Sequence, residues 1–353
     1  MPKDLILSKA QQETLDSFTK IDEHFYTLHY KSDYFLDKLL KTGCSCLKET
    51  AEFIADEMNL SSKYLDIKTG RFACTSFNAV TQDNENILAR NFDFKDSPCL
   101  AVWCEPENGY KSIGMIDLNF MLYGYKHQII DKSKTKTKLL MAPYVCTDGI
   151  NEKGLAIAVL EIKSKPAKQT AKGKLPLTTT CMIRAVLDKC ATVEEAITLF
   201  NRYNMNDVLF CNYHYHLLDK TGKSVLLEYV DNKLRILDKP EFENENTSSF
   251  FCANFFVSRD GDNEKGFGYD RYDIVKNTVI NKNGIVSQRE AMLALKECNL
   301  NYPKFCYRVT TLWSAVYNTS KVSMELCAGM NYKNQYTLEV SKPSMVQKTK
   351  FDC

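Results

Sequence analysis

The sequence has no long hydrophobic run and no excess of charge of either sign. Its first residues include Lys3 and Asp4, where a secretory signal would need an apolar stretch, and no later run approaches the length of a membrane span. Lysine plus arginine number 46 against 44 for aspartate plus glutamate, so no overall field attracts nucleic acid or an anionic membrane. We therefore expect a soluble, cytoplasmic protein with no nucleic-acid and no membrane partner.

Metal-ligand patterns are also scarce. The 14 cysteines are scattered through a long chain, so most should be reduced, buried, small apolar residues. Cys44 and Cys46 lack a second pair at zinc spacing, and His214 and His216, which share one face of a predicted strand, have no evident third ligand. We predict no metal and no cofactor.

The pattern of apolar residues predicts an α+β fold. Residues 1–60 have helical spacing, whereas β character begins at Phe72. Capping boxes at Thr192 and Ser287 indicate helices, and a further helix is expected over 180–188. Expected strands are 74–80, 87–94, 100–104, 144–146, 155–160, 208–217, 224–230, 233–237, 249–253, 309–317, 322–327 and 335–340. Face-to-face sheets covered by helices would accommodate this order.

The most informative residue is Cys74, in Ala73-Cys74-Thr75-Ser76. If the chain cut itself before Cys74, this residue would carry both a nucleophilic thiol and a free α-amine. The amine, with a pKa of about 7.7–8.0, can take the thiol proton near neutral pH. A buried structural cysteine is the ordinary interpretation of Cys74 taken alone.

Arg90 and Asp93 lie on the strand expected to pair with that of Cys74. A guanidinium favours thiolate over thiol, and a carboxylate can hold an α-ammonium group. Because 90 and 93 differ by an odd number, a regular strand points them to opposite faces. Both reach Cys74 only if the strand bends or ends between them.

Three segments resemble the choloylglycine hydrolase family: the one around Cys74, the one with Arg90 and Asp93, and Asp148-Gly149-Ile150-Asn151-Glu152-Lys153-Gly154-Leu155-Ala156. The family includes bile salt hydrolases and penicillin V acylases, and acid ceramidase is a relative. The resemblance extends over most of residues 72–340. It implies an αββα N-terminal-nucleophile hydrolase sandwich over 74–353 and the hydrolysis of linear amides in small N-acyl compounds.

The resemblance also implies roles for single residues. Cys74 would be nucleophile and base, Arg90 would stabilise the thiolate or the substrate carbonyl, and Asp93 would hold the α-amine. Asn254 would donate to the oxyanion, and Arg271 would keep the pocket positive. At one position the chain departs from bile salt hydrolases: Glu161 stands where they have an asparagine, and an ionised carboxylate cannot donate that hydrogen bond.

Residues 1–73 resemble the N-terminal segment of acid ceramidase, which is cut from the nucleophile-bearing subunit and stays bound. By that likeness the Ala73–Cys74 bond is self-cleaved, and the uncut segment covers the pocket. Two alternatives stay open, namely an acyltransferase that passes the acyl group to an amine and a non-catalytic binding protein. Homo-oligomers are common among the relatives.

Other features have plainer interpretations. Four aromatic residues that an acyl pocket could use are more often simply core: Trp103, Tyr123, Tyr125 and Trp313. The lysine-rich segment 163–174 is expected to be a solvated loop.

Overall fold

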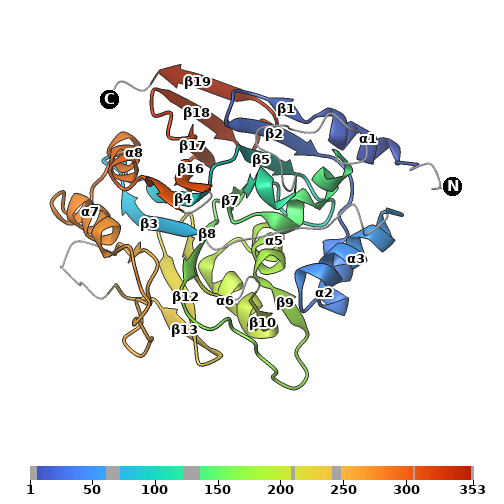
Figure 1. Cartoon of the computed structure of the whole chain (residues 1–353), viewed down its shortest axis with the longest axis horizontal. Helices are drawn as coiled ribbons and strands as arrows, with labels where there is room; N and C mark the ends of the chain where they lie inside the picture. The colour runs from blue at the N-terminus through green and yellow to red at the C-terminus, as the bar shows by residue number, and fades with distance from the viewer. Residues whose placement is uncertain are drawn as a thin grey trace.

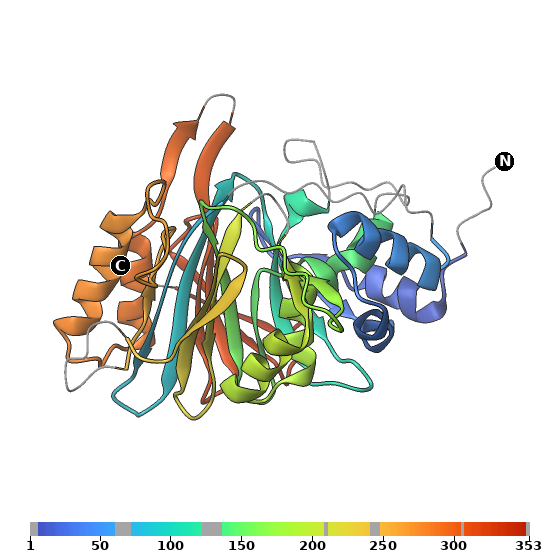
Figure 2. The same cartoon turned by 90° about the horizontal axis from the view of Figure 1, so that it is seen from below.

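The structure is a computed structural model, which describes residues 6–60, 72–121, 136–207, 211–240, 248–304 and 307–350. Two large sheets lie face to face with helices on both outer sides (Figures 1 and 2). The α+β prediction is confirmed. No helix in these ranges is long and apolar enough to cross a membrane.

The first sheet has nine strands in the order β1-β2-β5-β6-β7-β8-β11-β12-β13. Its strands are β1 (Thr19–Lys20), β2 (Phe25–Tyr30), β5 (Cys99–Cys104), β6 (Ser112–Asp117), β7 (Asp148–Asn151), β8 (Ala156–Ile162), β11 (Asn212–Leu218), β12 (Ser224–Val230) and β13 (Lys233–Leu237). The pairing of β2 with β5 is parallel, and the other pairings are antiparallel.

The second sheet has eight strands and carries the expected nucleophile. Its order is β14-β3-β4-β16-β17-β18-β19, with β15 paired to β16. The strands are β3 (Ala73–Val80), β4 (Asn86–Lys95), β14 (Phe251–Cys252), β15 (Asn301–Lys304), β16 (Tyr307–Asn318), β17 (Ser323–Ala328), β18 (Asn334–Glu339) and β19 (Val346–Lys350). The predicted pairing of the strand of Cys74 with the strand of Arg90 is confirmed, because β3 and β4 form a hairpin in continuous antiparallel register.

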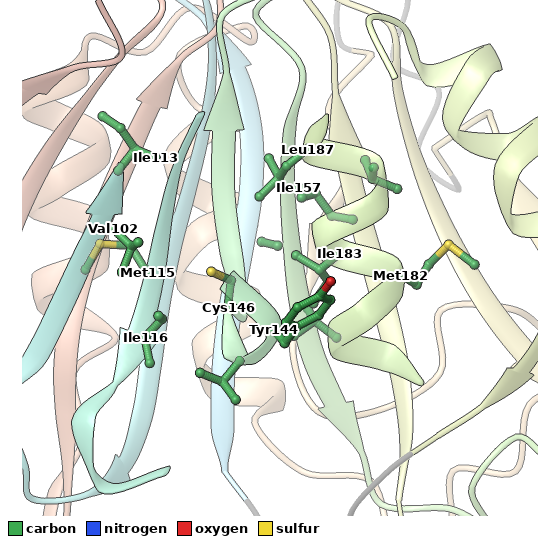
Figure 3. Packing of buried hydrophobic residues seen from close by; sticks show 14 of the residues in the cluster. Val102, Ile113, Met115, Ile116, Tyr144, Cys146, Ile157, Met182, Ile183 and Leu187 are labelled. Carbon is green, nitrogen blue, oxygen red and sulfur yellow. The ribbon is translucent and has the colours of Figure 1, made fainter. Parts of the chain in front are cut away.

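Helices cover the outer face of each sheet (Figure 2). The second sheet is covered by α7 (Tyr269–Ile280) and α8 (Gln288–Glu297), which contact β3, β4 and β16. The first is covered by α5 (Thr179–Lys189), followed by α6 (Val193–Arg202), and α5 contacts β7 and β8. Figure 3 shows Ile183 and Leu187 of α5 turned toward Ile157 of β8 in the main core. Two short strands, β9 (Pro176–Thr178) and β10 (Asn204–Asn206), pair beside α5 and α6.

The N-terminal region is not purely helical, which corrects the prediction for residues 1–60. It holds α1 (Lys9–Asp16), α2 (Leu36–Thr42) and α3 (Leu47–Glu57), but also β1 and β2. β2 adds to β5 over six paired residues and buries Phe25 and Leu28. The segment before Cys74 therefore contributes to the same sheet and core as the segment after it.

A second correction concerns the strand expected at 144–146. Most of this run belongs to the 3₁₀ helix η3 (Thr137–Val145); a shorter one, η2, covers Leu118–Phe120. Periodicity alone cannot separate a short apolar run in a strand from one in a helix, and this run is buried on every side. Helix α7 was not expected, whereas the 163–174 loop is confirmed apart from a single bridge at Lys168.

Candidate active site

Cys74 is the second residue of β3, where it faces the other sheet. In the β3–β4 register Cys74 lies opposite Phe92, and Ser76 lies opposite Arg90, so these side chains share the face between the sheets. Ala73 lies opposite Asp93, on the face toward the helices. Arg90 and Asp93 thus point to opposite faces, as their spacing predicts. The pairing of β4 with β3 is continuous between these two residues, whereas the pairing of β4 with β16 shifts register between Thr311 and Trp313.

The thiol of Cys74 is enclosed and contacts Arg90 directly. The residue is fully buried, and Arg90 Nη2 donates to Sγ at 2.9 Å. Sγ also lies 3.8 Å from the carbonyl oxygen of Val159 on β8. Burial raises the pKa of the Cys74 thiol to about 12, although the guanidinium groups of Arg90 and Arg271 lower it. In the intact chain the group is a neutral thiol near neutral pH.

Arg90 is held by a buried carboxylate that the sequence reasoning missed. Arg90 Nη1 donates to Asp148 Oδ1 at 2.5 Å, and neither side chain is exposed. Asp148 Oδ2 accepts from Trp313 Nε1 at 3.1 Å and from the Tyr317 hydroxyl at 2.6 Å. Asp148 is the first residue of one of the segments that carry the family resemblance, and this position is the sequence signal that could have identified it as a site residue. Its contacts fix the guanidinium beside the sulfur.

Asn254 and Arg271 contact the main chain of Cys74 from the other side. The amide of Cys74 donates to Asn254 Oδ1 at 3.1 Å, and Arg271 Nη2 donates to the same oxygen at 2.7 Å. Arg271 Nη1 donates to the carbonyl oxygen of Cys74 and, at 2.8 Å, to Thr75 Oγ1. The structure therefore brings both residues to Cys74.

A glycine makes room for this arginine. Gly268 caps the start of α7 with a φ of +86°, and a Cβ there would lie 2.2 Å from Arg271 Nη2. A side chain at position 268 would displace the guanidinium.

Asp93 contacts Arg271 and Thr311 rather than Cys74. Its Oδ2 lies 3.6 Å from Arg271 Nη1, and its Oδ1 accepts from Thr311 Oγ1 at 2.5 Å. Burial raises the pKa of Asp93 to about 6, against the lowering effect of Arg271. Asp93 lies opposite Ala73, the residue before the bond expected to be cut.

Glu161 also lies near Ala73. In its contacts with Phe72 and Asn254, its side chain and its main-chain carbonyl accept hydrogen bonds and do not donate to an oxyanion. Its carboxylate Oε2 accepts from the Phe72 amide at 2.6 Å, and its main-chain carbonyl accepts from Asn254 Nδ2 at 2.7 Å. The side chain is almost fully buried. Glu161 thus contacts the residue that precedes Ala73.

The two histidines are buried on a strand face, as expected. His214 Nδ1 lies 2.8 Å from Glu228 Oε1, and His216 lies within hydrogen-bond distance of Ser76 and Ser224. Burial lowers the pKa of His216 to about 3. No cluster of three or more potential metal ligands occurs in the described ranges.

The aromatic candidates belong to the core where they are described. Trp313 stacks on Phe92 with ring centroids 4.2 Å apart, and Trp103 Nε1 donates to the Glu339 carbonyl at 3.0 Å. Tyr123 and Tyr125 lie outside the described residues. A surface hollow exists at β13, lined by Arg235, Ile236, Leu237, Lys239, Pro240, Ser258 and Arg259, and none of the predicted site residues lines it.

The geometry defines a class of site: a strand-borne cysteine between two arginines, inside a two-sheet α+β fold. The chain belongs to the choloylglycine hydrolase family of linear amide C–N hydrolases, whose family model matches residues 74–250. A curated relative, the penicillin V acylase of Pectobacterium atrosepticum, is 30% identical over 174 residues. That alignment covers 46% of this chain and 45% of the acylase, so the chain spans about half the length of the curated relative it matches.

Solved structures agree on the fold. A conjugated bile acid hydrolase from Clostridium perfringens superposes with a TM-score of 0.53 at 16% identity, over 79% of this chain and 97% of that one. The penicillin V acylase of Agrobacterium tumefaciens gives a TM-score of 0.50 at 18% identity, over 78% and 91%. These likenesses confirm the sandwich predicted from the sequence.

Proposed function

We propose that this protein is a self-processing cysteine amidase that cleaves a linear amide of a small N-acyl compound. The observation that carries the proposal is the contact of Arg90 Nη2 with Cys74 Sγ at 2.9 Å, while Asn254 and Arg271 hold the main chain of the same residue. Another buried cysteine, Cys104, also accepts from an arginine, at 3.4 Å from Arg184 Nη1. Cys74 combines a shorter contact of this kind, which favours a thiolate, with side chains that hold its own amide and carbonyl.

The self-cleavage step would use the bond that the structure holds in place. The Cys74 thiol attacks the Ala73 carbonyl carbon, the carbon–nitrogen bond breaks, and the thiol proton passes to the departing nitrogen. Water then opens the thioester, which leaves a carboxylic acid on Ala73 and a free thiol and α-amine on Cys74.

Turnover would repeat this chemistry on a substrate. The new α-amine takes the thiol proton, and the thiolate attacks the substrate carbonyl carbon. The carbon–nitrogen bond breaks, the α-ammonium gives its proton to the departing amine, and a thioester remains. Water then opens the thioester, which releases the acid and restores the thiol. Arg90 favours the thiolate, and Asn254 Nδ2, which the Glu161 carbonyl holds near the cysteine, is the oxyanion donor. Arg271 holds the main chain through the Cys74 carbonyl, and Asp93, which lies opposite Ala73, would receive the new α-ammonium once the Ala73–Cys74 bond is cut.

Cleavage would break the covalent link between residues 1–73 and the rest of the chain, and we expect this N-terminal fragment to stay bound by non-covalent contacts. β2 lies between β1 and β5, and the Tyr30 and Tyr34 hydroxyls donate to the Leu140 carbonyl and to Asp188. Cutting after Ala73 breaks none of these contacts. The protein would then be a two-fragment enzyme.

Intact-mass spectrometry from acid to neutral pH tests the proposal. Fragments that meet at Ala73/Cys74 should appear in the unaltered protein and be absent in Cys74→Ala. Cys327→Ala, a buried cysteine in the same sheet, is the matched control and should cleave normally. An uncut mass throughout, with no labelling by a thiol-reactive acyl probe, would reject the amidase and favour a binding protein.

A further inference from the structure

The residues just before Cys74 occupy the space that an acyl group would need. In self-cleavage and in turnover the same sulfur attacks a carbonyl carbon, so the chain that leads to the Ala73 carbonyl stands where the acyl part of a substrate must stand. Ala73 and Phe72 are both buried, with exposed fractions of 6% and 4%. The intact chain therefore shows which groups surround that space.

Two aromatic rings receive the Phe72 side chain. Its ring centroid lies 4.9 Å from that of Phe92, on β4, and 6.0 Å from that of Tyr213, on β11. Phe92 in turn stacks on Trp313, so the Phe92 ring has limited freedom to move. The two strands belong to different sheets, and the ring is held between them. This surface suits a planar aromatic group.

A carboxylate receives the main-chain nitrogen of Phe72. Glu161 Oε2 accepts that N–H at 2.6 Å, and the side chain is only 1% exposed. Hydrogen bonds to a buried carboxylate are among the stronger ones in proteins. When the segment before Cys74 leaves the site, Glu161 loses this donor, and a substrate that restores it gains over one that does not.

We propose that Glu161, Phe92 and Tyr213 select a peptide-like acyl group. The preferred substrate is an amide whose acyl part ends in a small residue at the reacting carbonyl and carries before it an aromatic residue with a donor nitrogen. The nitrogen, as ammonium or amide, pairs with Glu161, and the ring lies between Phe92 and Tyr213. This inference rests on the proposed function, because it concerns substrates of Cys74.

The buried carboxyl group of Glu161 argues against other acyl groups. An acyl chain that placed a carboxylate or sulfonate at this depth would bury a second acidic group beside it, and burial disfavours the charged form. A purely apolar chain would pack against the rings of Phe92 and Tyr213 but would not replace the hydrogen bond that the Phe72 amide donates to Glu161. The donor nitrogen is therefore the group that distinguishes the preferred substrate.

The test compares two fluorogenic substrates on the self-cleaved full-length protein. One is the aminomethylcoumarin amide of phenylalanyl-alanine; the other is the amide of 3-phenylpropanoyl-alanine, which keeps the ring and lacks only the amine. We expect kcat/KM for the first to exceed that for the second by about 10–100-fold. Glu161→Gln keeps an oxygen acceptor but replaces the carboxyl group by an amide, so the ratio of kcat/KM between the two substrates should fall by about tenfold or more.

The outcomes separate the inference from the proposed function. Self-cleavage at Ala73/Cys74 with equal hydrolysis of both amides, faster hydrolysis of the one without the amine, or no hydrolysis of either, would overturn the inference alone. Absence of self-cleavage and of Cys74-dependent hydrolysis would overturn the proposed function as well. The ratio of kcat/KM for the two amides, measured on the unaltered protein, tests the inference whether or not Glu161→Gln is active.

Discussion

Removal of the buried Arg90–Asp148 ion pair is the most direct test of the architecture around the sulfur. Both side chains are fully buried, and the two polar atoms lie 2.5 Å apart. Arg90→Met leaves the Asp148 carboxylate buried with neutral donors only, and such a loss costs about 3–5 kcal/mol of unfolding free energy. Asp148→Asn likewise leaves a buried guanidinium without its counter-charge.

The double variant removes both charges, so its cost should be well below the sum of the two single costs. We expect a coupling energy of about 2–3 kcal/mol from a double-mutant cycle in urea. The exposed pair Arg235–Asp260 is the matched control: its side chains are 37% and 49% exposed, and its coupling should stay below about 1 kcal/mol.

Activity supplies the second measurement. The double variant recovers stability but not the donor on Cys74 Sγ, so it should fold and still fail to cleave at Ala73/Cys74 at the normal rate. Two results would refute the reasoning. One is a coupling energy no larger than that of the surface pair, and the other is normal self-cleavage in the double variant.

Three further changes have defined outcomes. Asn254→Asp keeps the acceptor for Cys74 and Arg271 but removes the Nδ2 donor, so kcat for amide hydrolysis should fall about 10²–10³-fold; an unchanged kcat would exclude Asn254 as the oxyanion donor. Burial raises the pKa of Asp117 to about 7, so the folded state binds more protons than the unfolded state between about pH 4 and 7, and stability falls as pH rises through that window. Asp117→Asn should therefore gain about 2–3 kcal/mol relative to the unaltered protein between pH 5 and pH 8 in urea titrations, and a constant difference would contradict the assignment. After self-cleavage the N-terminal fragment, with Phe25 buried in the sheet, should co-elute with the rest in gel filtration; separate elution without denaturant would show that β2 is not held as described.

The parts of the site that the sequence predicted are those that local pairing determines. The hairpin places Cys74 opposite Phe92, and the odd spacing of Arg90 and Asp93 gives their opposite faces. Asn254 and Arg271 were found only through the family resemblance, since no periodicity links them to Cys74. Their contacts cross about half the length of the chain.

The parts that the sequence did not predict depend on pairing between distant segments. β2 joins the nine-stranded sheet through parallel contacts with β5, in a region whose neighbouring segments have helical spacing. The carboxylate of Asp148 reaches Arg90 from the opposite sheet, and Glu161 reaches Phe72 in the same way. Contacts between the two sheets depend on how the sheets stack, which no single-strand pattern encodes.

The arrangement around β3 explains how one cut could activate the cysteine. An arginine paired with an aspartate lies on each side of β3. Arg90, on β4, pairs with Asp148 on the side of the other sheet, and Arg271, on α7, lies 3.6 Å from Asp93 on the side of the helices. Both guanidinium groups favour the thiolate, yet burial outweighs them and holds the pKa of Cys74 near 12. Cleavage would supply an α-amine, and movement of the residues just before Cys74 out of the site would admit water, while the arginines stay in place. Burial, which raises the pKa of the thiol, is then the effect that cleavage would reduce. The residues that surround an unreactive thiol in the intact chain would therefore surround a reactive one afterwards.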